Sequence, residues 1–162
     1  MTVGSRWLAP PMRSRGALAA VLVMAAVRLL MAQQTPPATP VGEWRQFDDR
    51  KGDLRSIVRI EVTDGELHGT IVRTIQRPGE PPDPVCDKCP GEFRDRPVEG
   101  LRFLWGLSGN GRSWDGGRIL DPEDGKIYRV KLRLSEDGQT LEVRGYLGVS
   151  LFGRSQHWKR AE

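Results

Sequence analysis

The sequence has few of the residues that carry chemistry at enzyme sites: two histidines and two cysteines in 162 residues. A structural metal site needs about four ligands, so all four of these residues would have to meet at one site to form it. Gly148 to Phe152 begins like a nucleophile elbow, but Phe152 stands where the second glycine belongs. Gly109-Asn110-Gly111 lacks the third glycine of a dinucleotide loop. We therefore predict no metal, no cofactor and no enzyme activity.

Acidic residues are absent from the first 32 positions, although four of the 25 basic residues lie there. The remainder of the chain holds 21 basic and 21 acidic residues and contains no basic run. A nucleic-acid-binding surface needs clustered lysine and arginine. The balance of charge therefore predicts that nucleic acid is not a partner.

The first 32 residues have the pattern of a secretory signal peptide. Basic residues precede an apolar run at 16–27, and a small-residue cleavage site follows near Ala32. The run is shorter than the roughly 20 apolar residues that span a bilayer. We expect a cleaved signal peptide at 1–32, a Pro-rich tether with nothing to bury at 33–40, and a periplasmic or secreted protein that meets the membrane only through its leader. An uncleaved anchor and a cytosolic chain are the alternatives.

We expect residues 41–162 to form one domain. Apolar and polar residues alternate along this segment, as they do in β-strands. Asp64-Gly65 and Asp137-Gly138 are typical of two-residue hairpin turns. The first turn pairs Val58 with Ile71 and Ser56 with Arg73, all on an apolar face. The second pairs Leu132 with Val143. Further strands are expected at 41–47, 98–106, 113–120 and 154–160. Because closing the sheet removes exposed edges, about eight antiparallel strands predict an all-β, up-and-down barrel.

Several motifs resemble those of a known family. Gly42-x-Trp44 is typical of the first strand of lipocalin-like barrels, and longer blocks follow it. With those blocks, the chain from Gly42 to Arg160 resembles a bacterial family of small exported proteins of unknown function. The resemblance implies a lipocalin-like barrel and an exported protein, and it transfers no catalytic role. The blocks are Cys86-x-x-Cys89, Gly100-Leu101, Trp114-Asp115-Gly116-Gly117-x-Ile119-Leu120-Asp121-Pro122, Gly125-Lys126-x-Tyr128, and Val143 to Trp158.

Cys86 and Cys89 are the only cysteines, and they lie between two predicted strands. In an oxidising compartment, two cysteines this close predict a small disulfide that holds the loop together. A redox pair, metal ligands and two free thiols are the other interpretations.

A barrel of eight strands either fills its interior with side chains or holds one small ligand. A filled interior predicts an envelope interaction or structural protein with a closed core. An interior that holds a ligand predicts a binding protein for a small apolar or amphipathic molecule. For the binding protein, the candidate ligand residues are Arg73, Ser56, Tyr128 and Trp44. Arg73, placed by its register among apolar neighbours, would meet an interior acid, water at the barrel mouth, or an anionic head group. The sequence predicts no oligomeric state.

Overall fold

The computed structural model describes residues 39–149, 151 and 153–161. The predicted signal peptide at 1–32, and the tether up to residue 38, lie outside the described residues. Within the part that is described, no helix is long and apolar enough to cross a membrane.

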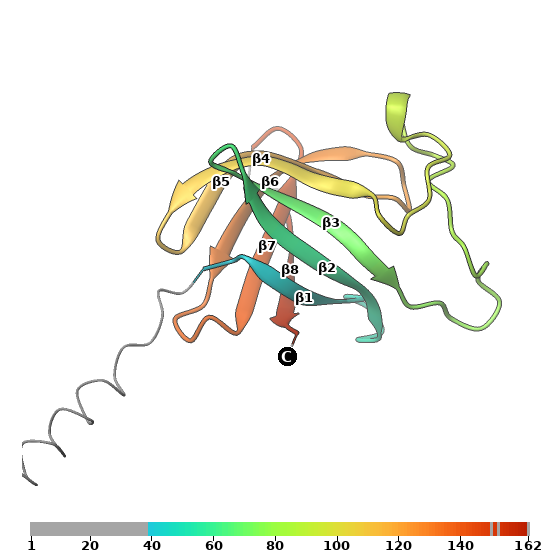
Figure 1. Ribbon diagram of the computed structural model, residues 1–162, viewed down its shortest axis with the longest axis horizontal. Helices are drawn as coiled ribbons and strands as arrows, with labels where there is room; N and C mark the ends of the chain where they lie inside the picture. The colour runs from blue at the N-terminus through green and yellow to red at the C-terminus, as the bar shows by residue number, and fades with distance from the viewer. Residues whose placement is uncertain (1–38, 150, 152, 162) are drawn as a thin grey trace, which may run out of the picture. The chain divides into compact units, whose positions relative to one another are not determined.

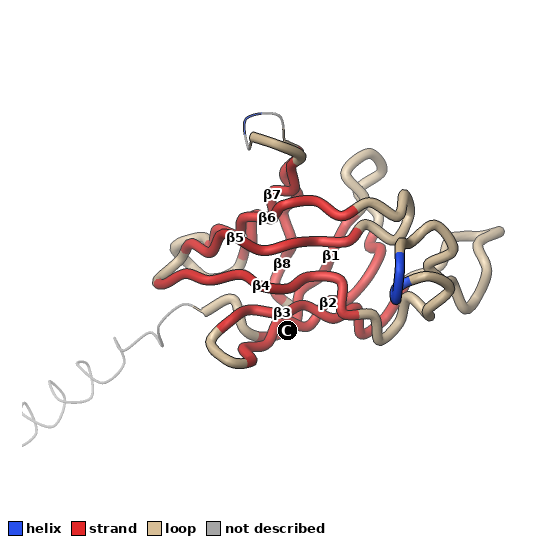
Figure 2. The backbone as a smooth tube through the Cα atoms, turned by 90° about the horizontal axis from the view of Figure 1, so that it is seen from above, coloured by secondary structure: helices blue, strands red, loops and turns tan. Residues whose placement is uncertain are grey.

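Eight antiparallel strands, each paired with its neighbour in sequence and the last with the first, form a closed barrel (Figure 1). This confirms the predicted all-β, up-and-down barrel. Figure 2 shows the connections at the two ends of the barrel, with the 3₁₀ helix η1 (Gly91–Phe93) in the longest of them. The strands are β1 (Gly42–Phe47), β2 (Leu54–Thr63), β3 (Glu66–Thr74), β4 (Arg102–Asn110), β5 (Ser113–Leu120), β6 (Ile127–Leu134), β7 (Thr140–Tyr146) and β8 (Arg154–Arg160).

Both hairpins have the predicted register beside their turns, but only Asp64-Gly65 forms the predicted two-residue primed turn. Asp64 and Gly65 both have positive φ, as a primed turn requires. Asp137 lacks the positive φ that such a turn requires, and the chain there forms a longer loop that the Ser135 N–H closes by donating to the Thr140 carbonyl. The predicted pairs Val58–Ile71 and Leu132–Val143 are both present.

The predicted pairing of Ser56 with Arg73 is wrong. The register shifts next to Val58, because Val72 is an extra residue on β3, so Ile57 faces Arg73 and Ser56 faces Thr74. Since side chains alternate between the two faces of a sheet, one extra residue moves everything beyond it to the opposite face. Ser56 stays inside the barrel, and Arg73 lies on the exposed outer surface.

The strand expected at 98–106 begins and ends about four residues later, as β4. Gly100 adopts a φ of 83°, and its N–H donates to the carbonyl of Ile71. That left-handed residue turns the chain immediately before β4, so residues 98–101 belong to the connection rather than to the strand.

The hydrophobic core fills one end of the barrel. Trp44 and Trp158, both fully buried, pack there with Val58, Ile60 and Leu141. The indole N–H of Trp44 donates to the carbonyl of Pro40 at 2.8 Å. Pro40 itself is buried, so the prediction that the tether has nothing to bury is wrong at its last residue.

Candidate ligand-binding cavity

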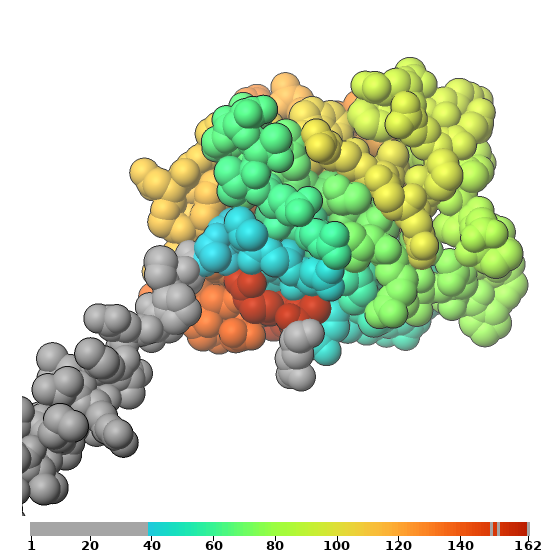
Figure 3. Space-filling view, viewed as in Figure 1, coloured from blue at the N-terminus to red at the C-terminus, as the bar shows by residue number. Residues whose placement is uncertain are grey.

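The other end of the barrel contains a cavity of about 770 Å³. It lies where β1, β3, β5 and β7 end and where the strands that follow them begin, so both sets of strand ends form its wall. The connection between β3 and β4, residues 75–101, contributes further lining residues such as Pro84, Val85 and Val98. In the space-filling view this segment, green to yellow, projects beside the barrel strands (Figure 3). We call residues 75–101 the lid.

One part of the wall is apolar. It is built by residues of β3, β4, β5 and β7 that line the cavity. Phe103, Leu120 and Val143 are almost fully buried, and Ile119 is half-buried. The apolar residues that line this wall are Ile71, Phe103, Ile119, Leu120 and Val143.

Opposite the β4–β5 strands, on β8, β1 and β2, the lining carries a row of three uncharged polar side chains, Gln46, Ser56 and Gln156. The Ser56 hydroxyl donates to Gln46 Oε1 at 2.6 Å, and Gln46 Nε2 donates to Gln156 Oε1 at 3.2 Å. The buried indole of Trp158 donates to the same Gln156 oxygen at 3.1 Å. These bonds fix the polar row above the closed core.

Ion pairs surround the mouth of the cavity. Arg55 lies 2.9 Å from a Glu80 oxygen and 3.6 Å from Glu123. Arg77 lies 2.8 Å from Asp48. Hydrogen bonds from Arg77 and from the backbone hold the pKa of Asp48 well below its usual range.

Two lining groups have a raised pKa. Burial raises the pKa of Asp121, and the neighbouring carboxylates of Asp124 and Glu123 raise it further. The hydroxyl of Tyr128 donates to Asp124 Oδ2 at 2.7 Å, and this bond is the main reason that the pKa of Tyr128 rises to about 12. The ring of Tyr128 therefore lines the cavity while its hydroxyl is engaged at the rim.

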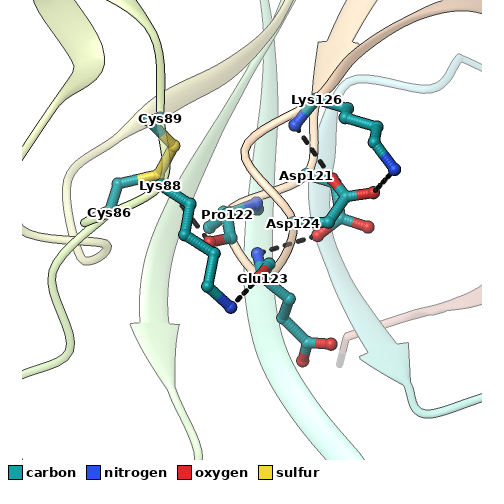
Figure 4. Close-up of a disulfide and its surroundings, with 8 residues drawn as sticks. All are labelled: Cys86, Lys88, Cys89, Asp121, Pro122, Glu123, Asp124 and Lys126. Carbon is teal, nitrogen blue, oxygen red and sulfur yellow. Dashed lines mark hydrogen bonds and ion pairs between the residues drawn. A yellow bond between two sulfur atoms is a disulfide. The ribbon is translucent and has the colours of Figure 1, made fainter.

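The lid is attached to the turn between β5 and β6, and Figure 4 shows this contact. Cys86 and Cys89 form a disulfide, as predicted, and both side chains are fully buried. Lys88 Nζ donates to the carbonyl of Glu123 at 3.0 Å, and a Cβ at Gly125 would overlap the carbonyl of Lys88. The disulfide loop and the turn are thus in close backbone contact.

The structure brings two of the four candidate ligand residues into the cavity, Ser56 and Tyr128. Arg73 is absent from its lining and borders a depression on the outer surface with Ile57 and Val72. Trp44 packs in the closed core instead. The extra residue Val72 moves Arg73 outside, and Trp44 lies too far toward the closed end.

Gln46 and Gln156 are the main lining residues that the sequence analysis missed. The signal for them was present: Gln46 follows the core residue Trp44 by two positions, and Gln156 precedes Trp158 by two. Period-two alternation places each glutamine on the interior face of its strand.

The comparisons with known proteins agree with this geometry. Residues 42–160 match a family described as "Uncharacterized protein conserved in bacteria (DUF2147)". The chain belongs to this family. Among curated proteins, none matches the sequence.

A solved structure is similar as well. It is described as "Protein HP1028 from the human pathogen Helicobacter pylori belongs to the lipocalin family". The TM-score is 0.66 at 23% identity, over 77% of this chain and 84% of that one. At 23% identity the similarity shows the fold alone. The protein described here therefore has a lipocalin-like barrel.

Proposed function

We propose that this protein is an exported, non-enzymatic barrel that binds one small apolar or amphipathic molecule in its cavity. The cavity of about 770 Å³ carries the proposal, because ligand pockets in proteins measure roughly 300–1,000 Å³ and combine apolar walls with a few placed polar groups. Here the apolar wall around Phe103 and the polar row provide both.

Export is supported by the leader. Its basic residues, apolar run and small-residue cleavage site are those of a secretory signal. N-terminal sequencing of the mature protein tests this part. We expect a chain that begins close to residue 33, and a chain that begins before Gly16 would contradict cleavage.

Binding is tested with N-phenyl-1-naphthylamine, an uncharged dye whose emission rises in apolar surroundings. We expect saturable binding of one dye per chain. Gly145 lines the cavity, and a Cβ there would lie 3.7 Å from the Cβ of Tyr128. Gly145→Phe should therefore narrow the cavity and weaken binding.

Gln139→Phe adds the same ring at an exposed turn and is the matched control, which should bind like the parent. Absence of dye binding to the parent would instead favour an envelope interaction or structural protein. Equal binding by both variants would place the dye outside the barrel and contradict the proposal.

A further inference from the structure

The polar row in the cavity consists only of uncharged donors and acceptors. Gln46 and Gln156 each have an amide with two N–H donors, and Ser56 has a hydroxyl. Within the row, Gln46 uses one of its N–H groups, on Gln156. Ser56 is only 5% exposed, so its oxygen is reached from the cavity rather than from bulk water. A hydroxyl, carbonyl or amide group of a ligand can exchange hydrogen bonds with such a row.

Three of the four cationic side chains that line the cavity are paired with carboxylates, and the fourth, Lys88, donates to the backbone carbonyl of Glu123. Arg55 contacts Glu80 and Glu123, and Arg77 contacts Asp48 and Asp53. Arg154 donates to Asp49, which also accepts a bond from Gln156. An anionic ligand beside one of these arginines would have to displace a carboxylate that the fold holds there.

The lining also holds Asp121, whose carboxylate is half-buried between β5 and the turn that follows it. Its neighbours Glu123 and Asp124 carry the same sign of charge. In a partly desolvated site, like charges repel more strongly than in water. This side of the cavity therefore opposes an anionic head group further.

We propose that the ligand is uncharged near neutral pH: an amphipathic molecule whose hydroxyl, carbonyl or amide group bonds to Gln46, Ser56 and Gln156 and whose apolar body lies against the Phe103 wall. This inference rests on the proposed function, since it specifies the ligand of the same cavity. It excludes fatty-acid carboxylates as the preferred ligand, although such a molecule is amphipathic.

The test compares three ten-carbon probes that differ only in the head group: decan-1-ol, decanoate and decylamine. Each is titrated at pH 7.5 by calorimetry. Tryptophan emission is a second readout, because the indole of Trp158 bonds to the polar row. We expect decan-1-ol to bind at least about tenfold more tightly than decanoate or decylamine.

Two variants test the structural reason for that preference. Ser56→Ala removes a hydroxyl from the row. The affinity for decan-1-ol should fall about threefold, which is the effect of one hydrogen bond, while the affinity for decanoate stays unchanged. Glu80→Gln removes the nearer of the two carboxylates beside Arg55, so the affinity for decanoate should rise at least threefold while the affinity for decan-1-ol stays unchanged. Glu61→Gln, an exposed change on β2, is the control and should alter neither affinity.

The outcomes separate this inference from the proposed function. Equal or tighter binding of decanoate or decylamine would overturn the uncharged ligand and leave a ligand-binding barrel. A preference for decan-1-ol that Ser56→Ala leaves intact would overturn the role of the row. Failure of all three probes and of the naphthylamine dye would overturn the proposed function itself.

Discussion

The guanidinium of Arg160 lies over the indole ring of Trp44, 4.4 Å from the ring centroid. The two residues face each other across the β1–β8 pairing, which has only two residue pairs and closes the barrel. Arg160 also donates to the carbonyls of Gly138 at 2.8 Å and Thr39 at 2.6 Å. One side chain thus joins the first strand, the last strand and the segment that precedes the barrel.

Arg160→Ala should lower the free energy of unfolding by about 3–4 kcal/mol. A partly desolvated cation–π contact contributes about 1–2 kcal/mol, and each lost hydrogen bond about 1 kcal/mol. Urea denaturation followed by tryptophan emission measures the change. Lys159→Ala is the control on the same strand, because the exposed side chain of Lys159 bonds Thr140 at the surface, and its loss should cost under about 0.5 kcal/mol. Equal effects of the two variants would contradict the role of Arg160.

Replacing Cys86 and Cys89 together by serine should affect the lid more than the barrel. The disulfide closes a loop of very few residues, so the chain-entropy model gives no more than about 2 kcal/mol. Amide exchange should accelerate within residues 84–98, where the N–H of Cys86 donates to the Arg96 carbonyl. In the parent, alkylation under denaturing, non-reducing conditions should label neither thiol. Full labelling of both would show that the disulfide is absent in the protein.

Gly125→Ala should loosen the lid, because the added Cβ overlaps the backbone carbonyl of Lys88. Gly111 also has a positive φ but open space around it, so Gly111→Ala has the same kind of backbone strain without the overlap. We expect Gly125→Ala to raise the dissociation rate of N-phenyl-1-naphthylamine about tenfold, and Gly111→Ala to leave it within about twofold. Equal rates in the two variants would show that this contact does not retain the ligand.

Tyr128 should ionise near pH 12 in the folded protein, well above the ordinary pKa of about 10. A raised pKa means that folding favours the neutral phenol, so this stabilisation is complete below pH 10 and is lost between pH 10 and 12. Tyr146→Phe leaves Tyr128 as the only tyrosine, which simplifies an ultraviolet titration. Adding Asp124→Asn should return the midpoint toward 10. A midpoint near 10 before that change would contradict the bond to Asp124.

The barrel could be predicted from the sequence because its determinants are local. The turn regions at Asp64-Gly65 and around Asp137-Gly138 mark two hairpins, and alternation assigns the faces of the strands beside them. Ser56 and Tyr128 were found in this way. Arg73 was misplaced because nothing in the sequence marks Val72 as an extra residue.

The covering of the cavity could not be predicted, because it depends on contacts between distant segments. Lys88 bonds to the carbonyl of Glu123, 35 residues away, and the close approach to Gly125 becomes visible only in three dimensions. The pairing of Arg77 with Asp48 is of the same kind. Charges that appear free in the sequence are therefore neutralised in the fold, which changes the class of ligand expected.

Native mass spectrometry of the protein purified from its own cells tests the central claim most directly. We predict a complex that exceeds the mass of the polypeptide by one small molecule, released on denaturation, uncharged at neutral pH, and depleted in the Gly145→Phe variant. A parent protein with the mass of the polypeptide alone, or a Gly145→Phe variant that carries as much of the small molecule as the parent, would contradict a ligand in the barrel.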